Sequence, residues 1–227
     1  MPLRPRSLAL ALLAAVAAAG FGTAAGPRPT PGGPEITIPA PGVAWSELAG
    51  FPCRHHGTRV RLTIQFHSLP ARWSAGPTRF GPGAFVAVSA WADEQFPWFE
   101  NEFENPAARF FVRRGTEIER TFASATPHQR FEVEGYVREV WLDRPWIEIV
   151  AATPLEEAIG EATVFHAARA LELMEVGTFV IADEALQQAL QQDALPPHAR
   201  EALGRLREIC IEEMADPKPA PIRPRGN

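Results

Sequence analysis

One stretch constrains the fold of this chain more than any other: Arg130–Thr153, RFEVEGYVREVWLDRPWIEIVAAT. Apolar and polar residues alternate along both of its halves, which is the period of a β-strand with one buried face. The apolar parity is carried first by Phe131, Val133, Gly135 and Val137, and later by Ile147, Ile149 and Ala151. Leu142–Pro145 separates the halves and contains the turn formers Asp and Pro, so we expect a β-hairpin.

Two details of this stretch carry expectations of their own. Gly135 falls on the apolar parity, which predicts a bulge or a close approach of another backbone. Thr153-Pro154-Leu155-Glu156 matches a capping box with proline at the first helical position. We therefore expect a sheet to end and helices to begin at about residue 153.

The N-terminus has the pattern of a secretory signal peptide over residues 1–25. Arg4 and Arg6 precede the apolar run Leu8–Ala19, and the small residues Thr23-Ala24-Ala25 follow. An uncleaved membrane anchor is the alternative, but the apolar run is shorter than the ~20 residues that a span needs. We expect an exported protein of the periplasm, the cell envelope or the extracellular space, with no membrane span after cleavage.

Two further segments are too rich in proline to form a core. Residues 26–44 read GPRPTPGGPEITIPAPGVA and predict an extended linker. Residues 215–227 hold four prolines and predict a disordered tail.

The charge opposes nucleic acid and anionic membranes as partners. The net charge is −5, and it becomes −7 without residues 1–25, which contain two arginines and no acids. Phosphate binding needs an excess of positive charge.

Cys53 and Cys210 are the only cysteines. In an exported protein such a pair predicts a disulfide. The alternative is two buried free thiols, each of which behaves as a small apolar side chain.

Three more strands are expected before the hairpin. Thr58–His67 alternates cleanly, with Val60, Leu62, Ile64 and Phe66 on one face. Ala84–Trp91 is almost wholly apolar and should be covered on both faces, and Phe110–Val112 is a short third strand. Asp93–Ala108 interleaves aromatics with acids and is expected to be anchored by its aromatics, whereas Thr116–Gln129 shows no strong period.

Five strands, with a connecting segment between the third and fourth, resemble an OB-fold barrel. The resemblance covers about residues 45–152 and is carried by VEGYVREVWLDRPWIEIV. It implies a small antiparallel barrel whose outward face holds oligonucleotides or oligosaccharides. The candidate binding residues on that face are Arg59, Arg61, Tyr136, Arg138 and Trp146. Arginine stacked on an aromatic ring is equally a structural contact.

The C-terminal part, residues 153–214, is expected to be helical, so that the fold class is α+β. Residues 154–214 resemble a single tetratricopeptide repeat, in which Gly177 ends one helix and the small Ala182 and Ala189 let two helices approach. A third, capping helix is expected from Pro197. Its apolar stripe comprises Ala199, Ala202, Leu203, Leu206, Ile209 and Cys210.

No catalytic or metal-binding constellation stands out. Cys53-Arg54-His55-His56 lacks the second pair of ligands that zinc needs. The acids of Glu94–Glu104 could serve acid–base chemistry in a hydrolase, but such spacing is more typical of a solvated face. There is no nucleophile elbow and no phosphate loop, so we predict no catalytic residue, no metal and no cofactor.

These observations predict a non-enzymatic binding or protein-interaction module of the cell envelope. Its partner would be an unidentified protein or envelope component. The alternative is binding of a glycan or of single-stranded nucleic acid on the barrel face, and an envelope hydrolase is the remote alternative.

Overall fold

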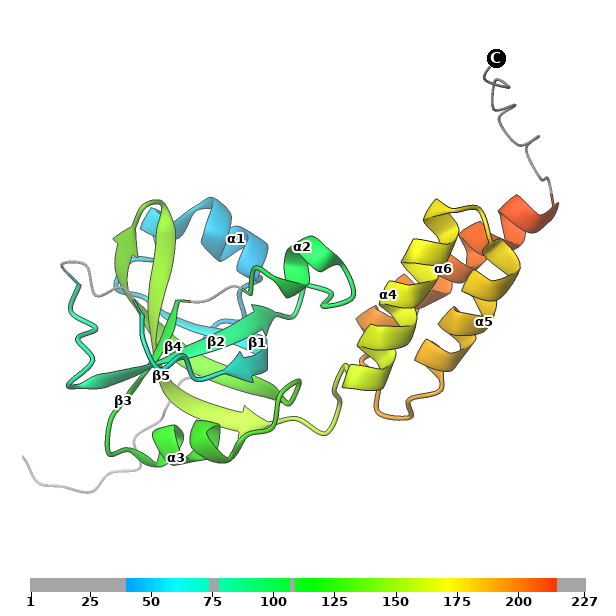
Figure 1. The fold of residues 1–227 in the computed structure, drawn as a ribbon. Coiled ribbons are helices and arrows are strands. Elements are labelled where there is room, and N and C mark those ends of the chain that lie inside the picture. The colour runs from blue at the N-terminus through cyan, green and yellow to red at the C-terminus, as the bar shows by residue number, and fades with distance from the viewer. Residues whose placement is uncertain (1–39, 74–77, 107–108, 216–227) are drawn as a thin grey trace, which may run out of the picture. The chain divides into compact units, whose positions relative to one another are not determined.

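The computed structural model describes residues 40–73, 78–106 and 109–215. Five strands close into a barrel in the order β1-β2-β3-β5-β4 (Figure 1). They are β1 Arg59–Ser68, β2 Phe85–Ala92, β3 Phe110–Arg113, β4 Arg130–Trp141 and β5 Arg144–Pro154. The predicted signal peptide at 1–25, the linker up to residue 39 and residues 216–227 of the predicted tail lie outside the described residues.

The barrel is mixed rather than wholly antiparallel. Strands β3 and β5 pair in parallel, while the other four pairings are antiparallel. A helix, α3 (Glu117–Ser124), connects β3 to β4. Five strands in this order with a helix at this point form an OB-fold-like barrel, as the resemblance implied. The expectation of an entirely antiparallel sheet was wrong for one pairing.

Helix α3 lies where the sequence showed no strong period. The side chain of Thr116 accepts a hydrogen bond from the backbone N–H of Glu119, and the Glu119 carboxylate accepts one from the N–H of Gly115 at 2.6 Å. Phe122 is the buried residue of the helix, and its ring lies 5.9 Å from that of Phe66 and 5.0 Å from that of Phe131. One aromatic side chain thus seats a short helix on the barrel core.

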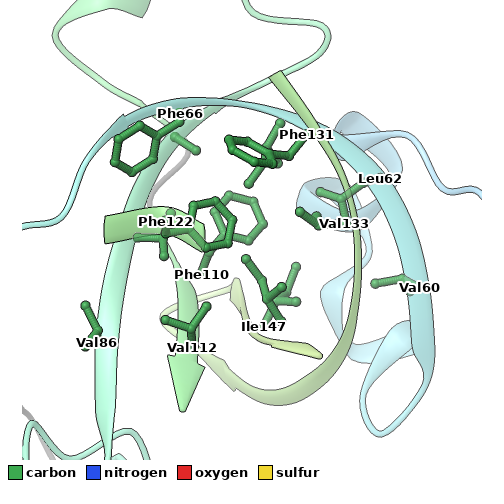
Figure 2. Packing of buried hydrophobic residues seen from close by; sticks show 14 of the residues in the cluster. Val60, Leu62, Phe66, Val86, Phe110, Val112, Phe122, Phe131, Val133 and Ile147 are labelled. Carbon is green, nitrogen blue, oxygen red and sulfur yellow. The ribbon is translucent and has the colours of Figure 1, made fainter. Parts of the chain in front are cut away.

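The barrel core is built from the inward parity of the strands, as the alternation predicted. Figure 2 shows the side chains of β1, β3, β4 and β5 meeting around Phe122. Every residue of β2 is buried, which confirms that this strand is covered on both faces. The buried members include Val60, Leu62, Ile64, Phe66, Val86, Val88, Phe110, Val112, Phe131, Val133, Val137, Ile147 and Ile149.

The hairpin of β4 and β5 is present, and Gly135 has the role predicted for it. The pairing register shifts between Glu134 and Gly135, which marks a bulge. A Cβ atom at Gly135 would lie 2.6 Å from Cγ2 of Ile147 and 2.8 Å from the carbonyl oxygen of Glu148. Only glycine therefore fits at position 135, where the backbone of β5 comes close. The turn itself is Leu142-Asp143, with φ values of 50° and 54°.

The predicted helix start at Thr153 was wrong. Strand β5 continues to Pro154, where Thr153 pairs with Glu132 and Pro154 pairs with Phe131. The N–H of Leu155 then donates to the carbonyl of Arg130 at 2.9 Å. The neighbouring strand offers ladder hydrogen bonds, so tertiary pairing overrides the local capping signal.

Three helices form the C-terminal part: α4 (Glu161–Glu175), α5 (Phe179–Leu190) and α6 (Pro197–Ala215). Gly177 has a φ of 76° and follows the end of α4. Ala182 and Ala189 are fully buried, so small side chains stand where the helices pack together. The predicted stripe of α6 is correct for Ala199, Leu203 and Cys210 but not for Ile209, which is 44% exposed.

The segment between β2 and β3 contains a short helix, α2 (Glu100–Phe103), and its aromatics have two destinations. Phe103 stacks on Trp91 of β2 at 5.7 Å between ring centroids. Phe96 and Trp98 instead pack with the apolar residues of the C-terminal helices. The aromatics therefore tie this segment to the helices as well as to the barrel.

The remaining short elements precede the barrel, namely α1 (Trp45–Gly50) and the 3-10 helix η1 (Pro52–His55). Cys53 lies exposed in η1, whereas Cys210 is buried in α6 among residues of the helical core. Both cysteines are free, so the predicted disulfide between them is not formed.

Candidate ligand-binding site

Two of the predicted binding arginines are held by a carboxylate of the barrel. Arg59 forms an ion pair with Glu134, and Nε of Arg61 lies 3.3 Å from Oε1 of the same carboxylate. The Glu134 side chain is only 18% exposed. Both guanidinium groups already bind the half-buried Glu134 carboxylate, so they are less available to bind an anionic ligand.

Arg138 is engaged in a similar way. Its Nε lies 2.7 Å from Oε2 of Glu148, and Nη2 of Arg113 lies 2.8 Å from Oε1 of Glu148. Burial alone would raise the pKa of Glu148, but hydrogen bonds from Arg113 and Arg138 hold this pKa below its usual value. The Arg138 guanidinium also lies 4.3 Å from the centre of the Tyr136 ring. Arg138 and Tyr136 therefore make structural contacts.

Trp146, the fifth predicted residue, belongs to a row of aromatic rings on the outside of the barrel. Its ring lies 5.0 Å from that of Phe111 and 6.0 Å from that of Trp141, and both pairs are stacked. Phe80, from the β1–β2 connection, continues the row on Phe111 at 4.2 Å. These rings and Phe85 form an apolar cluster separate from the barrel core.

A cavity of about 770 Å³ lies beside this row. Its lining comes from the β1–β2 connection, from β2 and β3, and from the β4–β5 hairpin. The lining residues are Pro70, Arg72, Trp73, Ala87, Val88, Ser89, Arg109, Phe110, Phe111, Trp141, Leu142, Arg144 and Trp146. We call this space the aromatic cavity; its size is typical of a site that encloses a small molecule.

The aromatic cavity carries positive charge. Arg72, Arg109 and Arg144 line it, and none of the described residues that line it carries a carboxylate. Burial lowers the pKa of Arg109, and the nearby charge of Arg144 lowers it further. Within the part of the chain that the structure describes, neither Arg72 nor Arg144 forms a salt bridge. An anionic group on a ligand would complement this lining.

One hydroxyl of the cavity lining contacts an imidazole. Ser89 lines the cavity, and its Oγ lies 3.3 Å from Nδ1 of His67. The hydroxyl of Ser68 lies 2.9 Å from the same nitrogen, and the ring of Trp91 packs edge-on against His67 at 4.8 Å. Burial lowers the pKa of His67, which favours the neutral ring. The Ser89 hydroxyl can therefore offer a hydrogen bond to a ligand, and the neutral His67 ring adds no charge beside it.

The other candidate sites remain dispersed. Among residues 40–73, 78–106 and 109–215, no group of three metal-ligating side chains comes together, and Nε2 of His55 lies 3.4 Å from Glu47. Of the acids in Glu94–Glu104, Glu94 accepts a hydrogen bond from the N–H of Ser46 and Glu102 accepts one from the N–H of Phe96. Each of these two carboxylates therefore bonds to a backbone N–H group, Glu94 to a distant segment and Glu102 to a nearby one.

The sequence prediction missed the cavity residues Arg72, Trp73, Trp141 and Arg144. A signal for them existed in the two connections that OB-like barrels use for ligands, those joining the first to the second and the fourth to the fifth strand. A tryptophan and an arginine stand at each connection: Arg72-Trp73 lie within the first, and Trp141 and Arg144 flank the second. The predicted arginines instead lie on the strand faces, where they pair with carboxylates.

Fold and cavity together define a small-molecule-sized site on an OB-fold-like barrel followed by helices. No protein-family model matches the chain, and neither a curated protein nor a solved structure shows significant similarity to it. No helix among the described residues has the length and apolarity needed to cross a membrane.

Proposed function

We propose that this protein is a non-enzymatic binding protein that holds a ring-bearing ligand in the aromatic cavity. One observation carries the proposal: a cavity of about 770 Å³ brings the indole rings of Trp73, Trp141 and Trp146 together with three arginines. Apolar walls with a few convergent polar groups are the usual form of a ligand site. Aromatic rings bind other rings by stacking, whatever the exact identity of the ligand.

The lining favours binding over catalysis. Among the described residues of the lining, Ser89 is the one with a side-chain hydroxyl, and none is a carboxylate, a cysteine or a lysine. His67 contacts Ser89, but its contacts are serine hydroxyls and the Trp91 ring. A nucleophile–base pair works best when a third group orients the base.

The setting that we propose is the cell envelope or the extracellular space. The basic, apolar and small-residue pattern of residues 1–25 supports export. Without those residues the net charge is −7, so an arginine-lined cavity is a local exception on an acidic chain. Such a local field attracts a small anion, while the overall charge repels long polyanions.

The proposed binding is tested by titrating tryptophan emission with nucleotides, aromatic acids, short peptides and cell-wall sugars. At least one ring-bearing compound should quench or shift the emission. Trp141→Ala should weaken that response by about fivefold or more, because stacking on one ring contributes ~1–3 kcal/mol. The matched control is Trp45→Phe, since Trp45 packs on the barrel core and does not line the cavity. No response from any compound would sink the proposal.

A second candidate function is protein interaction through the helices, which resemble one repeat of a tetratricopeptide array. The observation in its favour is exposed apolar surface: Phe165, Val180 and Ile181 are 66%, 60% and 53% exposed. Co-purification from envelope extracts would test it. A Val180→Asp variant that captures the same proteins as the natural chain would count against it.

A further inference from the structure

Residues 78–80 form a strap across the outside of the barrel. Oγ1 of Thr78 donates to Oε2 of Glu139 at 2.5 Å, and the backbone N–H of Arg79 donates to Oε1 at 2.9 Å. The Arg79 side chain also donates to this carboxylate from Nε at 3.2 Å. One carboxylate on β4 therefore anchors a segment that belongs to the β1–β2 connection.

The strap places an aromatic ring on the strands. Phe80 is fully buried and lies flat on Phe111 of β3, with 4.2 Å between centroids and 13° between ring planes. Its carbonyl accepts a hydrogen bond from Nε1 of Trp73 at 3.3 Å. Part of the outward face of β3 is thereby covered by the chain itself.

This occupation limits what the aromatic cavity can accept. A single-stranded polymer binds by laying successive bases on successive rings along an open groove. Here Phe80 already stacks on Phe111, so this part of the row is closed to a passing strand. What remains is the aromatic cavity of about 770 Å³, whose volume suits a compact ligand.

The lining also limits the chemistry of the ligand. Among the described residues of the lining, the charged side chains are all arginines, which donate hydrogen bonds and complement an anionic group. Arg72 and Arg144 are exposed and can turn toward an anion, while Trp73 and Trp141 are half-buried and offer ring surface. Arginine binds phosphate through two parallel hydrogen bonds.

On the basis of the proposed binding function, we infer that the aromatic cavity takes a compact ligand in which a planar ring is joined to a phosphate, of the size of a nucleoside monophosphate. The ring stacks against Trp73 or Trp141, and the phosphate lies between the side chains of Arg72 and Arg144. The strap excludes a continuous strand from the same site.

Four probes titrated into the full chain test this inference: adenosine monophosphate, adenosine, ribose 5-phosphate and a twelve-nucleotide single strand. The monophosphate should bind at least about tenfold more tightly than adenosine or ribose 5-phosphate, because each of these lacks one of the two recognised parts. The strand should bind no more tightly than the monophosphate.

Two variants and one control locate the site. Arg144→Ala should weaken monophosphate binding by about tenfold or more, as expected for loss of a charge-assisted hydrogen bond. Arg120→Ala, which removes an exposed arginine of α3 outside the cavity lining, should change it less than about twofold. Glu139→Gln weakens the anchor of the strap and should raise the affinity for the strand.

The outcomes separate this inference from the proposed function. Binding of the strand about a hundredfold more tightly than the monophosphate, with a steep salt dependence, would overturn the inference and leave a binding protein. Equal binding of adenosine and its monophosphate would also overturn it. Failure of all four probes, together with failure of every ring-bearing compound in the wider panel, would overturn both.

Discussion

The rings of Phe80 and Phe111 lie 4.2 Å apart and within 13° of parallel, although 31 positions of the chain separate them. Phe80 belongs to the β1–β2 connection and Phe111 to β3. Their contact joins a loop to the outer face of the barrel and forms one wall of an apolar cluster with Phe85 and Trp146. The stability of this outer cluster should therefore depend on the loop.

Phe80→Ala should lower the free energy of unfolding by about 3–5 kcal/mol, since it removes a fully buried ring and leaves a cavity. Urea denaturation measures the change. Phe165→Ala is the matched control, because Phe165 is 66% exposed and its loss should cost less than about 0.5 kcal/mol. Equal effects of the two substitutions would contradict the packing of Phe80.

Gly135→Ala should destabilise the barrel by about 2–3 kcal/mol. The added methyl group would meet Cγ2 of Ile147 at 2.6 Å and a backbone oxygen at 2.8 Å, and a backbone oxygen cannot move aside cheaply. Gly204→Ala in α6 is the control: its methyl group meets no atom within 4 Å, and alanine favours a helix by up to about 1 kcal/mol. Thermal unfolding of both variants should shift the midpoint in opposite directions.

Glu148→Gln should cost about 2 kcal/mol at neutral pH. The substitution removes the charge that faces Arg113 and Arg138 while keeping the shape of the side chain. The Glu148 side chain is 8% exposed, against 18% for Glu134, which also faces two arginines. Glu134→Gln should therefore cost less, and a larger loss for it in denaturant titrations would contradict this ranking.

Acid should remove the same contribution in the natural protein. The folded-state pKa values of Glu148 and Glu139 are both below the usual value, so these carboxylates stabilise the fold fully above the unfolded-state pKa of about 4.3. That stability is lost as pH falls from there through the lower folded-state pKa values. The melting temperature of Glu148→Gln should fall less steeply between about pH 5 and pH 3 than that of the natural chain. Parallel curves would contradict it.

The two cysteines should differ in reactivity. Cys53 is exposed and should react rapidly with a thiol reagent in the native protein. Cys210 should react only on unfolding, because it is buried and because burial, with a further effect of the Asp183 charge, raises its pKa. Denatured protein that was never reduced should show two free thiols; a count of none would establish the disulfide.

The parts of the fold that were predicted correctly rest on local pattern. In β1, alternate positions decide which residues face the core, and the buried set Val60, Leu62 and Ile64 follows directly. The role of Gly135 was predictable because a glycine at an apolar position of a strand usually marks a bulge or a close approach of another backbone. Helix α3 also had a local signal, the capping box of Thr116 and Glu119. A pattern of four residues is too short to predict a helix by itself.

The candidate site was less predictable, because charge pairing is a property of the folded chain. Arg138 and Arg144 look alike in the sequence, yet Glu148 pairs with Arg138, whereas Arg144 lines the cavity. Ten residues separate Arg138 from Glu148, and only the β4–β5 register, which pairs Tyr136 with Glu148, brings Arg138 within reach of that carboxylate. The choice between a structural and a binding arginine could not be made before that register was known.

The sequence by itself determined the five strands, their inward faces and the presence of helices after the barrel, since residue alternation and apolar spacing act over a few neighbouring positions. Only the tertiary structure decided that β5 would pair through Pro154 instead of yielding to a helix at Thr153. It also decided that the hairpin of Arg130–Thr153 would turn Trp141, Arg144 and Trp146 toward a cavity. Burial and pairing between distant segments outweigh local propensity wherever both act on the same residues.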